Sequence, residues 1–164
     1  MRKGTRYLKI ALIFFVAVQG LVGGFGNLAS LGTTTYDRVA RVLSMEGVPS
    51  SFPHLFAVDA PVFIWIGACW ILLLKLASGI SGAVGVVQLV RYRNGSAAEF
   101  QAAKHWGLFA CGAAILMFFG GFIVIGTTML FMWLTDAGQI AFEGATYFLV
   151  CLGIVAMYVG MRDE

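Results

Sequence analysis

Charged side chains are scarce in this sequence, and the scarcity excludes a soluble fold. Lys, Arg, Asp and Glu together make up 12% of the 164 residues, against about 25% in soluble domains. Hydrophobic residues account for 60% of the chain, which is more apolar surface than a soluble domain of this length can bury. We therefore expect an all-α integral membrane protein whose main solvent is lipid.

Cysteine and histidine are also rare, which bears on metal, haem and disulfide chemistry. The sequence has an odd number of cysteines, and all lie inside hydrophobic stretches: Cys69, Cys111 and Cys151. This argues against a disulfide framework and against a metal site. His54 and His105 lie near opposite ends of the predicted spans, so they cannot ligate one haem iron together.

Nucleophile-elbow, Walker and Rossmann patterns are missing from every polar segment long enough to fold around them. With the paucity of metal ligands, this predicts that the protein is not an enzyme and has neither a cofactor nor a metal site. We expect bound phospholipid, and no nucleic acid partner, because the basic residues follow the pattern of a membrane topology.

Four hydrophobic runs are long enough to cross about 30 Å of hydrocarbon, which takes about 20 helical residues. The short connections favour antiparallel neighbours, so the sequence predicts one domain, 1–164, built as a four-transmembrane-helix bundle. The predicted spans are residues 8–30, 62–90, 106–133 and 140–161, with an outer loop at 31–60 and a cytoplasmic loop at 91–105.

Both predicted loops contain helical signals. The segment TTTYDRVARVLSMEG in the outer loop has helical periodicity and predicts an amphipathic helix of about eleven residues, too short to span the bilayer. In the cytoplasmic loop, Ser96 and Glu99 have the spacing of a capping box, so we expect another helix to begin at Ser96.

Lysine and arginine fall unevenly on the two sides of the predicted membrane. The outer loop holds only Arg38 and Arg41. Under the positive-inside rule this asymmetry places both termini in the cytoplasm and predicts a multi-pass membrane protein. The basic residues on the predicted cytoplasmic side are Arg2, Lys3, Arg6, Lys9, Arg91, Arg93, Lys104 and Arg162.

Small residues mark the faces on which the first two spans are expected to pack. Gly20 and Gly24 form a GxxxG pair in the first span. Ser78, Gly82 and Gly85 provide small side chains at helical spacing in the second. Such residues let two helix backbones approach closely in a membrane.

Two tryptophans bracket the third predicted span. Trp106 and Trp133 would lie roughly 40 Å apart on one continuous helix, about the thickness of a bilayer with its headgroups. We predict that they anchor the two ends of this helix at the membrane interfaces.

Lys75 and Glu143 are the only ammonium and carboxylate groups well inside the predicted spans. Because intramembrane charges usually pair, we predict that Lys75 contacts Glu143. Two alternatives remain for Lys75: a carboxylate of a partner subunit or a lipid phosphate. If the second span is shifted so that its outer edge lies near Trp70, Lys75 can instead extend outward to the interface.

Several short motifs resemble those of a bacterial family of predicted small integral membrane proteins of unknown function. The resemblance covers nearly the whole chain. It implies a four-helix membrane fold, a location in the bacterial inner membrane and no particular activity. The motifs are Asn27-Leu28, Val42-Leu43-Ser44-Met45, Ala103-Lys104, Phe131-Met132-Trp133 and Gly138-Gln139 followed by Ala141-Phe142.

These observations favour an accessory or structural subunit that packs against other integral membrane subunits of a larger respiratory or transport complex. One alternative is a small homo-oligomeric transporter or channel with Lys75 on the path of an anion. A third is quinone or lipid binding between the helices, which leaves no sequence signature.

Overall fold

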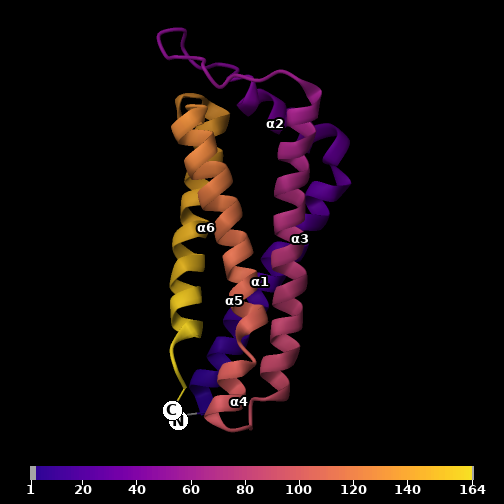
Figure 1. Cartoon of the computed structure of the whole chain (residues 1–164), viewed down its shortest axis with the longest axis vertical. Coiled ribbons are helices and arrows are strands. Elements are labelled where there is room, and N and C mark those ends of the chain that lie inside the picture. Colours follow the sequence, from indigo (N-terminus) through magenta and orange to yellow (C-terminus); the bar gives the residue numbers. More distant parts are fainter. Residues whose placement is uncertain (1–2, 164) are drawn as a thin grey trace.

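The computed structural model describes residues 3–163 and consists of four long antiparallel helices with short helical segments between them (Figure 1). Each long helix is sufficiently long and apolar to cross a membrane, which confirms the predicted four-helix membrane fold. We call the end of the bundle that holds both termini the termini end, and the opposite end the loop end. The long helices are α1 (Lys3–Ala29), α3 (Pro61–Arg91), α5 (His105–Ile115) continued by the π-helical segment η2 (Leu116–Met129), and α6 (Asp136–Gly160).

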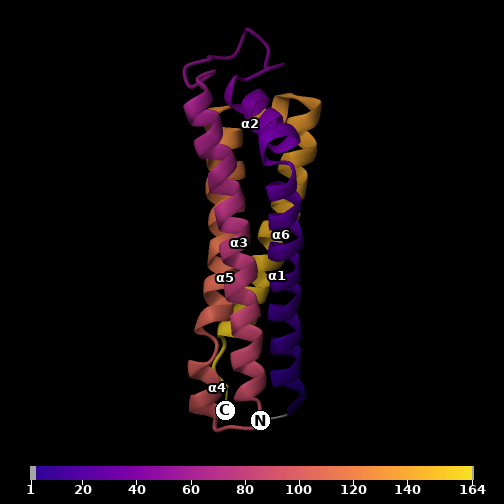
Figure 2. The same cartoon turned by 90° about the vertical axis from the view of Figure 1, so that its right-hand side faces the viewer.

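Helix α3 packs against both α1 and α5, while α6 packs on α5 and η2. Figure 2 shows α3 beside α1. The main core runs between these helices from the termini end to the middle of the bundle. Its largest fully buried apolar side chains include Ile13, Leu89, Phe100 and Met117. The other faces of the long helices carry exposed apolar side chains, as expected of helices that face lipid.

The α1–α3 contact is a seam of glycines. A Cβ atom added to Gly20 would lie 2.5 Å from the backbone nitrogen of Gly79, and one added to Gly82 would lie 2.9 Å from Ala17 Cα. Gly24 makes the same kind of approach to the side chain of Leu76. Only glycine permits helix backbones to come this close.

The seam continues onto the third long helix. A Cβ on Gly85 would lie 2.7 Å from the backbone nitrogen of Gly107 in α5. Ser78 is buried on the same side of α3. The small residues singled out in the sequence therefore lie where α3 meets α1 and α5.

The loop end is covered by the segment between α1 and α3. After a kinked turn, η1 (Leu31–Thr35), the short helix α2 (Tyr36–Leu43) packs on α3, where Val39 Cγ1 lies 3.0 Å from a Cβ added to Gly67. Beyond α2, Met45 and Val48 are buried against the turn that follows η2. The helix in this loop is shorter than predicted, because the chain turns after Leu43 and Met45 adopts a positive φ of 57°.

The third long helix ends earlier than predicted. Helical structure stops at Met129, and Phe131 adopts a left-handed conformation with φ 51°. Trp133 therefore lies in a separate short helix, η3 (Met132–Leu134), and does not share a continuous helix with Trp106. Both tryptophans are partly exposed near opposite ends of the bundle.

Two helix starts have defined caps. Helix α4 (Ala97–Ala102) begins with the predicted capping box, in which Ser96 Oγ accepts from Glu99 N and the Glu99 carboxylate accepts from Ser96 N. Helix α6 begins at Asp136, four residues before the predicted start, because Thr135 Oγ1 caps it by accepting from Gly138 N at 3.1 Å.

The α1–α3 seam yields a first prediction. Replacing Gly20 with Ala is expected to lower the free energy of unfolding in detergent by about 1–3 kcal/mol, because the new methyl group would overlap the α3 backbone. Gly26→Ala in the same helix is the matched control: nothing lies within 4 Å of a Cβ there, so stability should stay equal or rise slightly. Equal thermal stability of the two variants would contradict the assigned role of the seam.

Candidate functional site

The two intramembrane charges do not meet. No ion pair within 4.0 Å joins Lys75 to Glu143 in residues 3–163. Lys75 is half-buried on α3 with its ammonium over Gly23 of α1, whereas Glu143 is exposed on α6 and accepts a hydrogen bond from Gln139 Nε2 at 3.2 Å.

The rotation of α6 explains why the predicted pair does not form. The buried residues of α6 include Ala145, which packs toward the core. Glu143, two residues earlier, lies about 200° around the helix from Ala145, at about 100° per residue. The carboxylate of Glu143 therefore faces away from the bundle, and Lys75 takes no partner from this helix.

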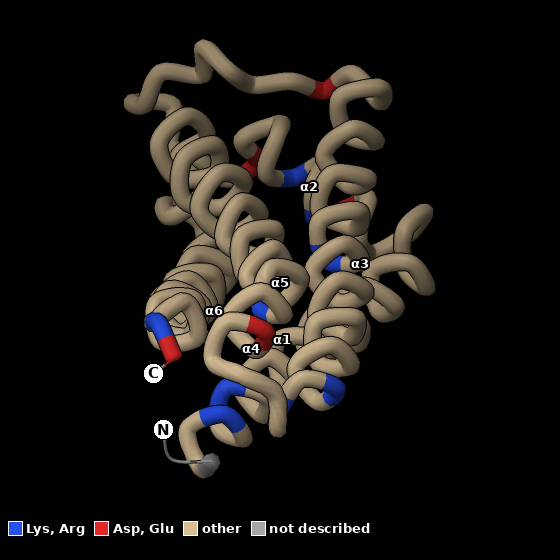
Figure 3. Tube along the Cα trace, turned by 60° about the horizontal axis from the view of Figure 1, so that its bottom comes forward, with Lys and Arg blue, Asp and Glu red and all other residues tan. Residues whose placement is uncertain are grey.

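Buried ion pairs form at the termini end, where the chain segment after α6 meets α1 and the residue preceding α5. Asp163 Oδ1 lies 3.0 Å from Lys9 Nζ, and Asp163 Oδ2 pairs with Lys104 Nζ. The three charged side chains are at most 2% exposed. Both ammonium groups also donate to Met161 O at 2.8 Å, so they compensate the carbonyl end of α6. We call Lys9, Lys104 and Asp163 the ion triad; Figure 3 shows basic residues gathered at this end.

Neighbouring side chains make further contacts with the ion triad and with the same end of the bundle. Lys104 Nζ donates to Gln101 Oε1 at 2.8 Å. The Lys9 ammonium lies 5.7 Å from the ring centre of Tyr158. Arg6 closes the same end by donating to Arg93 O at 2.9 Å and to Gly95 O at 2.7 Å. The triad thus joins α1, the residue preceding α5 and the segment after α6, and Arg6 adds the α3–α4 connection.

The environment of Asp163 favours its ionised form. Burial acts against ionisation, but the hydrogen bonds and positive charges of Lys104 and Lys9 outweigh it, so the pKa of this carboxyl lies below its ordinary value. The carboxylate therefore remains charged at neutral pH, as its two lysine partners require.

No motif in the sequence predicts this triad. Lys9 and Lys104 were counted only as topology signals, and Asp163 stands at the end of the chain with no motif around it. The available signal was the position of three charges at the ends of three different spans, all predicted on one side of the membrane. Because Lys9 and Asp163 are separated by 154 positions, no local pattern links them.

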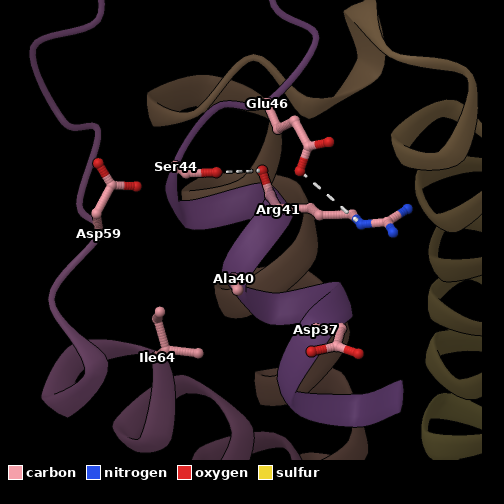
Figure 4. Close-up of a pocket in the computed structure, with 7 residues that line it drawn as sticks. All are labelled: Asp37, Ala40, Arg41, Ser44, Glu46, Asp59 and Ile64. Carbon is pink, nitrogen blue, oxygen red and sulfur yellow. Dashed lines mark hydrogen bonds and ion pairs between the residues drawn. The ribbon is translucent and has the colours of Figure 1, made fainter. Parts of the chain in front are cut away.

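A pocket of about 380 Å³ opens at the loop end between α2, the following loop and the start of α3 (Figure 4). Asp37, Glu46 and Asp59 contribute carboxylates to its wall. Arg41 pairs with Glu46 across an Nε–Oε2 distance of 3.9 Å, and Ser44 donates to Arg41 O at 3.3 Å. These carboxylates do not form a metal-binding group among the described residues.

Comparison with known proteins identifies the family to which the chain belongs. Residues 5–162 match the model of a family described as predicted small integral membrane proteins, DUF2165. The chain belongs to this family. The resemblance inferred from short motifs is thereby confirmed. The family description states an integral membrane protein, and the four long apolar helices of this DUF2165 protein make it a multi-pass one. Neither a search of curated proteins nor a search of solved structures finds a match.

The ion triad yields a prediction about stability. Asp163→Asn is expected to lower the free energy of unfolding by about 3–5 kcal/mol, because it leaves two buried ammonium groups without their counter-charge. Glu46→Gln removes the carboxylate of the exposed Arg41–Glu46 pair and should change stability by less than about 1 kcal/mol. Denaturant unfolding of both variants in one detergent measures the difference, and an equal effect would contradict a structural role for the triad.

The same carboxyl predicts a pH dependence. Because the pKa of Asp163 is lower in the folded chain than in the unfolded one, its stabilisation is fully present above the ordinary carboxyl pKa of about 4. It is lost as the pH falls through the lowered value. The stability advantage of the wild type over Asp163→Asn should therefore shrink progressively in acid. Thermal unfolding of both proteins across a pH series tests this, and a gap that stays constant throughout would refute it.

Proposed function

We propose that this DUF2165 protein is a non-catalytic accessory subunit that packs against another integral membrane protein through the outward face of α6. The observation that carries the proposal is an exposed stripe along this helix. Its members recur every three or four residues, the spacing of a helix–helix contact. The α6 stripe consists of Ile140, Glu143, Tyr147, Val150, Ile154 and Met157.

Only a narrow strip on the opposite side of α6 packs against the rest of the chain. Its buried residues recur at intervals of seven and form one narrow line. Ile140 on the stripe is 74% exposed and Met157 is 69% exposed. The residues of the buried line are Gly138, Ala145, Leu152 and Val159.

Glu143 distinguishes this stripe from an ordinary lipid-facing surface. It lies seven residues into α6, about 10 Å from the start of the helix at 1.5 Å per residue. A carboxylate facing hydrocarbon at that depth is costly, and intramembrane charges usually pair. A partner helix with a basic or hydrogen-bonding side chain opposite Glu143 would relieve this cost.

A transporter with Lys75 on an anion path is the second candidate, and the packing supports it less. A pore needs a continuous polar lining. The core cluster, which includes Ile13, Val16, Ala114 and Met117, fills the bundle interior with apolar side chains.

The charge distribution supports a location for the subunit. Arg6, Lys9, Arg91, Arg93 and Lys104 all lie toward the termini end. By the positive-inside rule we place this end in the cytoplasm, and from the resemblance to a bacterial family we place the protein in a bacterial inner membrane. The α6 stripe would then present Glu143 in the outer half of the bilayer.

The proposal predicts that a companion membrane protein co-purifies with the wild-type chain in mild detergent, and that Val150→Trp removes it. Val150 is 56% exposed on the α6 stripe, so the larger side chain obstructs docking without entering the core. Val22→Trp, at a residue 68% exposed on α1, is the matched control and should retain the partner. Native mass spectrometry identifies the bound chains.

Glu143→Gln should weaken the same association while leaving the fold unchanged, since Glu143 is exposed and its only side-chain partner in the described chain is the neighbouring Gln139. A wild type that purifies alone, or only with copies of itself, would contradict the proposal. Retention of the partner by both α6 variants would place the interface elsewhere and overturn the assignment to α6.

A further inference from the structure

Lys75 lies on the packed side of α3 and has no ion-pair partner among residues 3–163. Its Nζ is 3.4 Å from the position of a Cβ on Gly23, so the absence of a side chain at Gly23 makes room for the ammonium group. The Lys75 side chain is half-buried, and an ammonium group inside a membrane span usually pairs with a negatively charged group.

Arg38 is a second cation in the same region. It belongs to α2, which packs on α3 through the neighbouring Val39. The contact of Val39 with Gly67 lies about two helical turns along α3 from Lys75. The positive charge of Arg38 acts on Lys75 from this position. Within the described chain Arg38 forms no ion pair either, whereas Arg41 pairs with Glu46. Two like charges are therefore held near each other at the junction of α1, α2 and α3.

Aromatic side chains indicate the level of this junction in the membrane. The rings of Tyr36 and Trp65 lie 5.1 Å apart, and Trp65 and Trp70 are both partly exposed on α3. Tyr and Trp are enriched at the headgroup level of bilayers. Lys75 lies five residues beyond Trp70, about 7.5 Å deeper, a depth from which a lysine side chain can extend to the interface.

We propose that Lys75 and Arg38 bind the phosphate of an anionic phospholipid at the α1–α2–α3 junction. A phosphodiester supplies oxygen acceptors for both cations, and arginine matches its geometry bidentately. Basic pockets between membrane helices bind anionic headgroups in the same manner. A zwitterionic headgroup carries its own cation and would compensate the pair less well. This site is separate from the α6 stripe and independent of the proposed function.

Native mass spectrometry of the full chain, released from nanodiscs of phosphatidylglycerol mixed with phosphatidylcholine, tests the site. The wild type should retain phosphatidylglycerol selectively. Lys75→Met and Arg38→Gln should each reduce the retained phosphatidylglycerol about tenfold, because each removes a charge-assisted hydrogen bond. Arg41→Gln, on the same helix as Arg38, is the control and should retain it. Circular dichroism checks that each variant is folded, and the exposed Arg38 makes its variant informative even if Lys75→Met does not fold.

A competition arm distinguishes a lipid from a soluble phosphate compound. Inorganic phosphate in excess should leave the retained phosphatidylglycerol unchanged, since the acyl chains contribute to its binding. Displacement by inorganic phosphate would overturn the assignment to a lipid. Equal retention of the two lipids, or unchanged retention in both the Lys75 and the Arg38 variants, would overturn the site itself.

Discussion

In lipid the hydrophobic effect gives two apolar helices no reason to associate, so the bundle depends on close packing where backbones meet. The contact between Gly20 and Gly79 is the tightest such approach between α1 and α3. It fixes the distance and rotation of these two helices, and Gly85 against Gly107 extends the same constraint to α5. The position of Lys75 over Gly23 is a consequence, because both residues lie next to this seam.

The ion triad fixes the position of the chain at the end of α6. Val159 packs the last turn of α6 into the core, but Met161 in the segment after it is 62% exposed. That segment is held instead by Lys9 and Lys104, which bind both Met161 O and the Asp163 carboxylate. A buried pair of this kind is weak evidence for net stability, but removal of one member leaves uncompensated charge in the interior. The triad therefore specifies where the end of α6 lies more than it increases overall stability.

The number and approximate limits of the spans could be predicted from the sequence, because hydropathy and span length are local properties. The capping box at Ser96 was equally local and is confirmed. The prediction that the third helix ends at Trp133 was wrong. The helix ends before a left-handed turn at Phe131, and no glycine or proline marks this turn in the sequence. The ion triad could not be predicted, because it depends on which helix ends meet in space. The rotation of α6, which separates Glu143 from Lys75, likewise depends on packing at Ala145.

The chain thus treats its membrane charges in two ways. At the termini end it supplies both signs itself, and the groups are buried together. In the loop-end half, Lys75 and Glu143 stand on different faces and find no ion-pair partner in residues 3–163. To bring Glu143 to Lys75, α6 would have to turn by about half a revolution, which would expose the buried line of Leu152 and Val159. The packing of α6 therefore keeps the two charges apart, and we propose a different neighbour for each: a partner helix at Glu143 and a lipid phosphate at Lys75.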